Sequence, residues 1–142
     1  MKLWNPQAEN LSRAELRTIQ FEKLKTLVTR VETLSPYYRD KFKRAGVSAA
    51  SLKSLDHYQD FPFFDKDEER LSQARSKAEL GHPLGMHITC DRQLVNRISS
   101  SSGTTGSPTF SGFSKFDREL AAENTSRGMV RMGIEPGDVV LH

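Results

Sequence analysis

Residues 99–109 form the segment whose residue types and spacing are best suited to chemistry. They read Ser-Ser-Ser-Ser-Gly-Thr-Thr-Gly-Ser-Pro-Thr and include no large side chain. Gly103 and Gly106 let the backbone approach an anion closely, and successive N–H groups can form a concave nest. The hydroxyl groups can donate further hydrogen bonds, and Pro108 stiffens the exit of the segment. This pattern predicts a loop that binds phosphate.

The glycine spacing excludes two common nucleotide-binding loops. A Walker loop has four residues between its glycines and a lysine after the second, and a dinucleotide-binding turn reads Gly-x-Gly-x-x-Gly. Gly103 and Gly106 are separated by two residues, and no lysine follows. The flanking pattern is strand–loop–strand, whereas both of those loops lead into a helix. On composition alone, a flexible serine/glycine linker is the alternative interpretation.

Other residues that could do chemistry do not combine into a site. His82, His87 and Cys90 lack the paired spacing of zinc ligands. Cys90 is the only cysteine and has no catalytic partner that the sequence identifies. The acidic run from Asp65 to Glu69 is interpreted as the solvated start of a helix, and Phe61–Phe64 as core packing.

The elements that must position the loop are mostly helices before residue 80. Apolar residues recur at helical spacing over about 13–34, and Ser12 with Glu15 matches a capping box. After this helix, glycine and hydroxyl residues mark the ends of several shorter elements. We predict helices over about 37–44, 51–58, from 65 and from 115 to 132, and strands at 86–89, 94–98, 110–113 and 139–141.

The order of these elements predicts an α/β fold in two parts. Residues 1–80 would form a helical N-terminal subdomain, and residues 81–142 the beginning of an α/β domain that carries the loop 99–109 in the start of a mixed β-sheet. A buried parallel strand usually leads into a crossover helix, and the strand at 139–141 has none after it. We therefore expect an incomplete domain, a fragment of a larger protein.

Composition narrows the class of protein. Hydrophobic residues make up 36% of the 142 residues, without a stretch long enough to span a bilayer or a signal peptide at the start. A single cysteine favours a reducing, cytoplasmic setting. The net charge is +3, and residues 1–50 hold 10 basic and 5 acidic groups. This excess is interpreted as a solvated helical surface rather than a nucleic-acid face, so we expect neither a nucleic acid nor a membrane as partner.

The residue order of the loop carries a family resemblance. Ser101-Ser102-Gly103-Thr104-Thr105-Gly106-Ser107-Pro108-Thr109 resembles the phosphate-binding loop of the adenylate-forming superfamily. Further landmarks, in the family's order, resemble the opening of phenylacetate–coenzyme A ligases: Trp4-Asn5-Pro6, Ser12-Arg13-x-Glu15-Leu16, Tyr37-Tyr38-Arg39-x-Lys41-Phe42, Ala45-Gly46-Val47, Phe61-Pro62-Phe63, Pro83-Leu84-Gly85-Met86 and Gly133-Ile134-x-Pro136-Gly137-Asp138-Val139-Val140.

The resemblance implies roles for residues of the loop. Ser107 stands where these ligases commonly carry lysine, so either Arg97 or Lys115 supplies the missing charge or nucleotide turnover is weaker. Ser107, Arg97 and Lys115 are the candidate auxiliary phosphate contacts. Thr104 or Thr105 would lie near Mg²⁺. The family's catalytic lysine and its adenine-binding motifs are expected beyond residue 142. The residues implied to bind the ATP phosphates are Ser101, Ser102, Gly103, Thr104, Thr105 and Gly106.

By the same resemblance, the chain is the N-terminal part of an AMP-forming aryl–coenzyme A ligase of aromatic acid catabolism. Its small-molecule substrates would be an aromatic carboxylic acid such as phenylacetate, ATP with Mg²⁺, and coenzyme A, and the fragment alone is expected to be inactive. Two alternatives remain open. One is an adenylylating enzyme of the same superfamily with another acceptor, and the other is a non-catalytic helical interaction module with a serine-rich linker.

Overall fold

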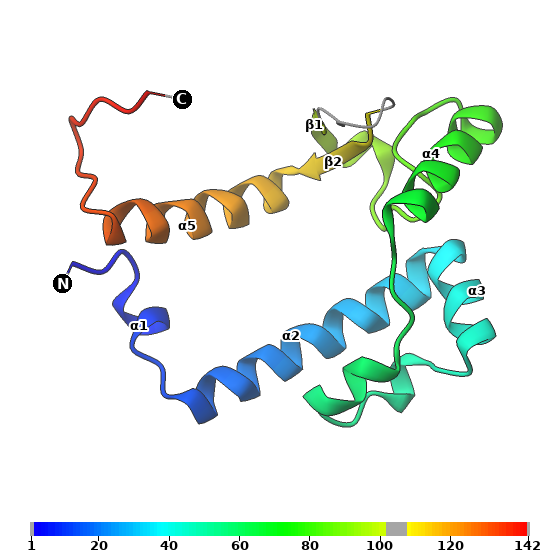
Figure 1. Ribbon diagram of the computed structural model, residues 1–142, viewed down its shortest axis with the longest axis horizontal. Coiled ribbons are helices and arrows are strands. Elements are labelled where there is room, and N and C mark those ends of the chain that lie inside the picture. Colours follow the sequence, from blue (N-terminus) through cyan, green and yellow to red (C-terminus); the bar gives the residue numbers. More distant parts are fainter. Residues whose placement is uncertain (1, 102–107, 142) are drawn as a thin grey trace.

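The computed structural model describes residues 2–101 and 108–141. These residues are mostly helical, with one two-stranded antiparallel sheet, β1 paired with β2 (Figure 1). None of the helices in these ranges is both long and apolar enough to cross a membrane. The elements are α1 (Pro6–Glu9), α2 (Arg13–Leu34), α3 (Pro36–Ala45), η1 (Ala49–Ser51), η2 (Leu55–Asp60), α4 (Lys66–Leu80), η3 (Arg92–Leu94), β1 (Val95–Ser100), β2 (Phe110–Ser114) and α5 (Lys115–Arg131).

Local capping rules account for the helix boundaries. The Ser12 hydroxyl accepts the Glu15 N–H at 3.3 Å, and the Glu15 carboxylate accepts the Ser12 N–H at 2.9 Å, so α2 starts at the predicted capping box. Ser35 ends α2 and caps α3, and Gly46 ends α3 with a φ of 71°. The predicted long helices and the order of helices before sheet are confirmed. The α/β fold class is confirmed with them.

Two predicted strands are wrong. At 86–89 the chain turns, because the Met86 N–H donates to the Ser72 carbonyl (3.3 Å) and hydroxyl (2.8 Å) of α4 instead of to a neighbouring strand. Residues 139–141 are also not a strand, since no described strand lies beside them to complete a ladder. The predicted helix at 51–58 is replaced by the two short 3-10 helices η1 and η2.

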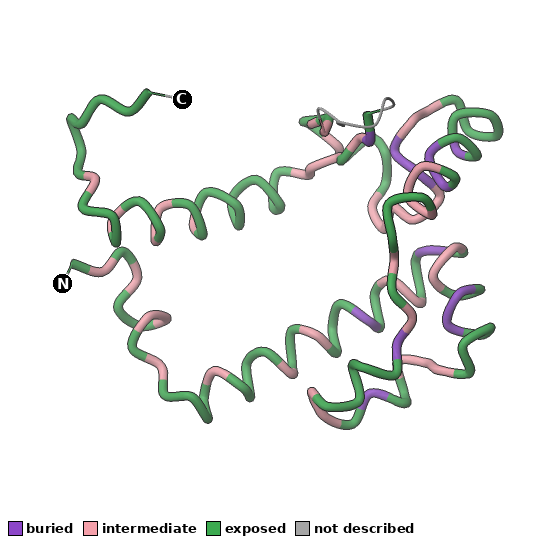
Figure 2. Tube along the Cα trace, viewed as in Figure 1, coloured by how far each residue is buried: buried purple, intermediate pink, exposed green. Residues whose placement is uncertain are grey.

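An apolar core joins α2 and α3 to the segments around η1 and η2. We call its four buried members, Val28, Phe42, Leu52 and Phe61, the apolar core. The Phe42 and Phe61 rings meet edge to face, with centroids 5.1 Å apart. The prediction that Phe61–Phe64 packs in the core is confirmed for Phe61, which is buried. It is wrong for Phe63, which is 92% exposed. Buried positions also lie on α4 and in the segment after it, whereas α5 has none (Figure 2).

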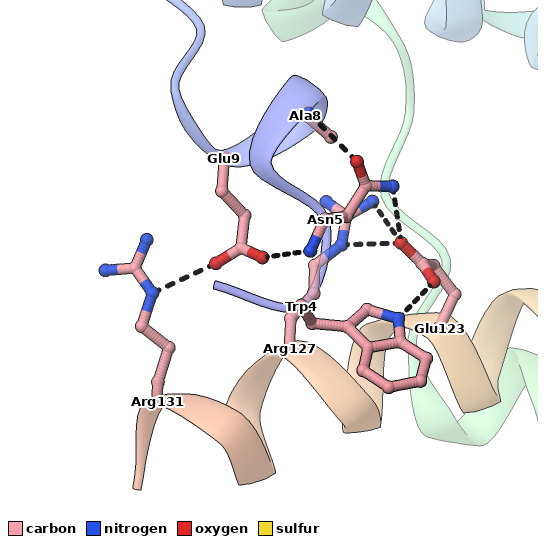
Figure 3. A network of polar contacts seen from close by, with 7 residues as sticks. All are labelled: Trp4, Asn5, Ala8, Glu9, Glu123, Arg127 and Arg131. Atoms are coloured by element: carbon pink, nitrogen blue, oxygen red, sulfur yellow. Dashed lines mark hydrogen bonds and ion pairs between the residues drawn. The ribbon is translucent and has the colours of Figure 1, made fainter. Parts of the chain in front are cut away.

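The N-terminal segment lies against the far end of α5 through polar contacts (Figures 1 and 3). The Glu123 carboxylate accepts the Trp4 indole N–H at 2.7 Å, the Asn5 amide at 2.9 Å and the Arg127 guanidinium at 2.8 Å. Arg131 donates to Glu9 at 3.0 Å, and Lys2 to Glu135 at 2.8 Å. We call this set the terminal polar cluster: Lys2, Trp4, Asn5, Glu9, Glu123, Arg127, Arg131 and Glu135.

Candidate phosphate-binding site

The candidate loop connects the two strands of the sheet. β1 pairs antiparallel with β2, and Ser100 lies opposite Phe110. The two strands predicted on either side of the loop are therefore confirmed. Six of the predicted site residues lie outside the described residues: Ser102, Gly103, Thr104, Thr105, Gly106 and Ser107. The Mg²⁺ contact predicted for Thr104 or Thr105 lies outside them as well.

Ser101 and Thr109 close the loop where it meets the sheet, and we call this pair the loop stem. The Ser101 N–H donates to the Thr109 carbonyl at 2.9 Å, which adds one rung to the ladder. The Thr109 N–H donates to the Ser101 hydroxyl at 3.2 Å, and the two side-chain oxygens lie 3.1 Å apart. Thr109 is buried. The stem thus fixes both ends of the candidate loop.

Gln73 of α4 holds the outer edge of β2. In an antiparallel pair, alternate residues turn their N–H and C=O groups away from the partner strand. Thr109 bonds to β1, so the groups of Phe110 face outward. The Gln73 amide donates to the Phe110 carbonyl at 2.7 Å and accepts the Phe110 N–H at 3.1 Å. Gln73 is buried, and each of its two bonds satisfies a backbone group beside the loop exit.

The buried face of α4 is polar, and it also holds the segment after the helix. Its buried residues are Ser72, Gln73 and Ser76. The Ser76 hydroxyl donates to the His82 carbonyl at 2.7 Å and accepts the Gly85 N–H at 2.9 Å. A helix that buries hydroxyl and amide groups in this way orients its neighbours by hydrogen bonds rather than by apolar area.

A partly buried ion pair fixes the start of α4. Lys41 of α3 is 8% exposed and donates to the Glu68 carboxylate, which also accepts the Asp65 N–H in the capping box of α4. The hydrogen bond from Lys41 is the main reason that the pKa of Glu68 is lowered. Burial, followed by the negative charge of Glu68, raises the pKa of Tyr37 to about 12. The pair therefore ties α4 to the half of the molecule that contains the apolar core.

Lys66, the first residue of α4, contacts the loop stem. Its Nζ donates to the Ser101 hydroxyl at 3.3 Å. Sequence analysis identified neither Lys66 nor Gln73 as a site residue. The available signal was their spacing: the two residues are seven apart in a predicted helix, which places them on one face two turns from each other.

Arg97 and Lys115, predicted to supply charge to the phosphates, both line one cavity of the described structure. With Arg118 they line a cavity of about 810 Å³ between the sheet and α5. The wall of this cavity also includes Ser99, Phe113, Thr125 and Ser126. Neither Arg97 nor Lys115 makes a hydrogen bond to Ser101 or Thr109, the described residues of the loop stem. Their role as phosphate contacts stays a prediction.

His87 is part of the framework around α4. His87 packs on Phe64, with ring centroids 4.9 Å apart, and its Nδ1 lies 2.9 Å from the Ser72 hydroxyl. Burial lowers the pKa of His87, which favours the neutral ring in this contact. Within residues 2–101 and 108–141, no three His, Cys, Asp or Glu side chains gather in a way that could hold a metal ion.

Solved structures with this fold are adenylate-forming ligases. The chain superposes on 2-hydroxyisobutyryl-CoA ligase in the postadenylation state with 2-HIB-AMP at a TM-score of 0.80 and 28% identity, over 90% of this chain and 26% of that one. The same ligase in the thioesterification state, with 2-HIB-AMP and CoA, gives a TM-score of 0.79 and 31% identity. The described fold is thus part of an adenylate-forming CoA ligase fold.

The sequence relatives of the chain include several phenylacetate–coenzyme A ligases. The chain is 34% identical over 140 residues to a phenylacetate–coenzyme A ligase of Thermus thermophilus, 36% identical over 132 residues to one of Aromatoleum evansii, and 30% identical over 132 residues to one of Escherichia coli. No protein-family model matches the chain. The predicted resemblance is confirmed, and the chain is a relative of the phenylacetate–coenzyme A ligases. The alignment with the Thermus thermophilus ligase includes 99% of this chain but only about 29% of that relative.

Proposed function

We propose that this chain is the phosphate-binding part of an AMP-forming coenzyme A ligase that activates an aromatic carboxylic acid. The observation that supports this most strongly is the continuous similarity to phenylacetate–coenzyme A ligases over 99% of the chain, with the Ser-Ser-Gly-Thr-Thr-Gly loop between two paired strands. A flexible linker between modules has no need of a stem that is hydrogen-bonded on both sides and held by a helix.

The proposed reaction has two steps. A carboxylate oxygen of the acid attacks the α-phosphorus of ATP, an acyl-adenylate forms, and pyrophosphate leaves with the electron pair of the broken P–O bond. The thiol of coenzyme A then attacks the acyl carbon, loses its proton, and AMP leaves. Mg²⁺ is expected to arrive on the phosphate oxygens of ATP, since it is usually held by substrate phosphates and few protein groups.

The loop would contribute positioning and charge stabilisation. Backbone N–H groups around Gly103 and Gly106 and hydroxyl groups from Ser101 to Thr105 would donate hydrogen bonds to the β- and γ-phosphates. Such donors stabilise the charge that collects on pyrophosphate as it leaves. Because the chain spans about 29% of its relative, we propose that phosphate binding is the activity of these residues and that they form no acyl-CoA alone.

Limited proteolysis tests the proposal. The chain is treated with a protease of low sequence specificity, with and without Mg-ATP, and cleavage within residues 99–109 is followed by mass spectrometry. We expect Mg-ATP and inorganic tripolyphosphate with Mg²⁺ to protect the segment, and AMP, which lacks the β- and γ-phosphates, to leave it open. Gly106→Val should abolish the protection, because a Cβ there obstructs close approach of the phosphates. Cleavage that is independent of nucleotide would favour the linker interpretation.

A further inference from the structure

An open groove of about 930 Å³ is lined by residues of α2, the sheet and α5. Four large apolar side chains on its wall are between 46% and 70% exposed: Leu27 of α2, Leu94 of η3, and Phe116 and Leu120 of α5. We call these four the groove residues. They come from different elements but line one concave surface, so they form a shared apolar surface. An exposed apolar surface of this kind is typical of a site that contacts another molecule.

The side of α5 that faces the groove is apolar and uncovered in the described part of the chain. Phe116 and Leu120 are four residues apart, so their side chains lie on one side of the helix. A helix in a folded protein usually buries such an apolar face. The helix α5 buries none of its residues, and polar contacts of Glu123 and Arg131 join it to the N-terminal segment (Figures 2 and 3). Its apolar side is therefore free for a further contact.

The sheet beside the groove is also incomplete as a structural unit. It has two strands, and β1 pairs with no described strand other than β2. A two-stranded sheet is marginally stable in water unless further strands or a helix cover it. Val95 of β1 and Phe110 and Phe113 of β2 contribute to the groove wall, and none of the three is buried. The face of α5 and the sheet are thus uncovered at the same place.

The groove suits a protein partner better than a small ligand. Pockets for small molecules enclose the ligand and bury most of its surface. The groove residues stay about half exposed or more, so the groove is open to solvent. The described fold corresponds to only 26% of 2-hydroxyisobutyryl-CoA ligase, and the sequence to about 29% of the Thermus thermophilus relative. Proteins with this fold therefore contain further polypeptide that is available to cover the groove.

We propose that the groove residues form the docking surface for a polypeptide equivalent to the part of the phenylacetate–coenzyme A ligases that this chain does not match. This inference rests on the proposed function, because phosphate binding alone forms no acyl-CoA. The partner presents apolar side chains that cover Phe116 and Leu120 of α5 and Leu27 of α2, and it joins the two helices across the groove. Docking is favourable because this apolar area leaves water.

The test measures binding of the intact chain to the segment of the Thermus thermophilus ligase that lies outside the alignment, produced as a separate chain. Isothermal titration calorimetry should show a one-to-one complex. Phe116→Asp and Leu120→Asp place a charge in the apolar contact, and each should weaken binding by about tenfold or more. Phe116→Leu keeps an apolar side chain and should bind nearly as tightly as the parent. Phe63→Asp is the matched control and should bind like the parent, because Phe63 is 92% exposed and does not line the groove.

A second measurement uses the intact chain alone. The dye anilinonaphthalene sulfonate fluoresces when it binds exposed apolar surface. The parent and Phe63→Asp should therefore enhance its fluorescence more than Phe116→Asp or Leu120→Asp, and the ligase segment should displace the dye from the parent. Far-UV circular dichroism spectra that match the parent show that the variants are folded.

The outcomes separate this inference from the proposed function. Equal binding of the ligase segment by the parent, Phe116→Asp and Leu120→Asp would overturn the docking surface, and so would a parent chain that does not bind the segment. Self-association of the parent that Phe116→Asp abolishes would assign the groove to a second copy of the chain and would also overturn it. A complex that depends on the groove but forms no phenylacetyl-CoA keeps the docking surface and counts against the proposed function. Protection of residues 99–109 by Mg-ATP without docking has the opposite meaning.

Discussion

The apolar core and the terminal polar cluster stabilise opposite parts of the molecule by different physics. Phe42 and Phe61 are 5% and 8% exposed and pack ring against ring. In the terminal polar cluster, the ion pair of Lys2 with Glu135 joins side chains that are 65% and 61% exposed. Burial of aromatic area contributes several kcal/mol, about 2 to 3 for each large side chain, whereas an exposed ion pair contributes about 0 to 1. The core therefore supplies stability, and the cluster mainly supplies position.

This difference matters because the candidate site lies on the well-stabilised side. The loop stem is bonded to α4, and α4 is joined to α3 by Lys41 and Glu68. The helix α5 follows β2 directly and has no buried residue, and polar contacts join its middle and C-terminal end to the N-terminal segment (Figures 2 and 3). We expect the stem to keep its geometry under conditions that open the terminal polar cluster.

The largest predicted effect comes from the core. Phe42→Ala removes a ring that contacts Tyr38 and Phe61 and leaves a cavity, so the free energy of unfolding should fall by about 3 to 5 kcal/mol. The measurement is urea denaturation followed by far-UV circular dichroism. Phe63→Ala is the matched control, since this ring is 92% exposed, and it should change the free energy by less than about 0.5 kcal/mol. Equal effects of the two substitutions would show that the core does not dominate stability.

The sequence predicted what short-range rules determine. The capping box of Ser12 and Glu15 joins residues three apart, and Gly46 ends its helix by its own backbone preference, so both were visible in the sequence. The two strands around the candidate loop were predictable for the same reason, because small and turn-forming residues separate two short runs that contain apolar residues.

The rest depended on contacts between distant residues. Gln73 meets Phe110 and Lys41 meets Glu68, and nothing local to either residue indicates its partner. The buried face of α4 carries Ser72, Gln73 and Ser76, so a search for apolar periodicity could not identify it. The prediction of a strand at 139–141 was wrong because it considered only local residue types. These residues favour a strand, but a strand also needs a neighbouring strand to bond with, and no described strand pairs with them.

An intermediate effect is predicted where a charge is buried between the core and the site. Glu68→Gln leaves the Lys41 ammonium, on a residue that is 8% exposed, without its counter-charge, and should lower the free energy of unfolding by about 1 to 3 kcal/mol. Glu79→Gln, which breaks an exposed pair with Arg75 four residues away on the same helix, should cost less than Glu68→Gln, because solvent screens the exposed pair. Urea denaturation at pH 7 distinguishes them, and equal costs would place Lys41 and Glu68 among ordinary surface pairs.

The same pair makes stability depend on pH. Because the pKa of Glu68 is lowered in the folded chain, its contribution is complete above the ordinary glutamate value of 4.5. The contribution is lost as the pH falls below 4.5 and through the lower folded pKa. The difference in stability between the parent chain and Glu68→Gln should therefore shrink as the pH is lowered from 6 toward 3. A difference that grows over this interval would contradict the direction of the shift.

The smallest effect on stability is predicted for a substitution in the terminal polar cluster, and the fluorescence of Trp4 reports on it directly. Trp4 is the only tryptophan, and its indole N–H donates to Glu123 at 2.7 Å. Glu123→Gln removes the charge that Asn5, Trp4 and Arg127 share, so the emission of Trp4 should shift to the red while the melting temperature falls less than for Glu68→Gln. Glu119→Gln, four residues earlier on α5 and paired at 3.8 Å with Lys115, should leave the emission unchanged.

Acid should open the cluster before it affects the core. The hydrogen bonds from Asn5, then Trp4 and Arg127, lower the pKa of Glu123 from 4.5 to about 2. The contribution of Glu123 is therefore complete above pH 4.5 and is lost as the pH falls through about 2. We expect the emission of Trp4 to hold to about pH 4 and to shift between there and pH 2, with Glu123→Gln already shifted at pH 7. A red shift in the parent chain near pH 6, where Glu123 is fully ionised, would show that something other than this carboxylate holds Trp4 against α5.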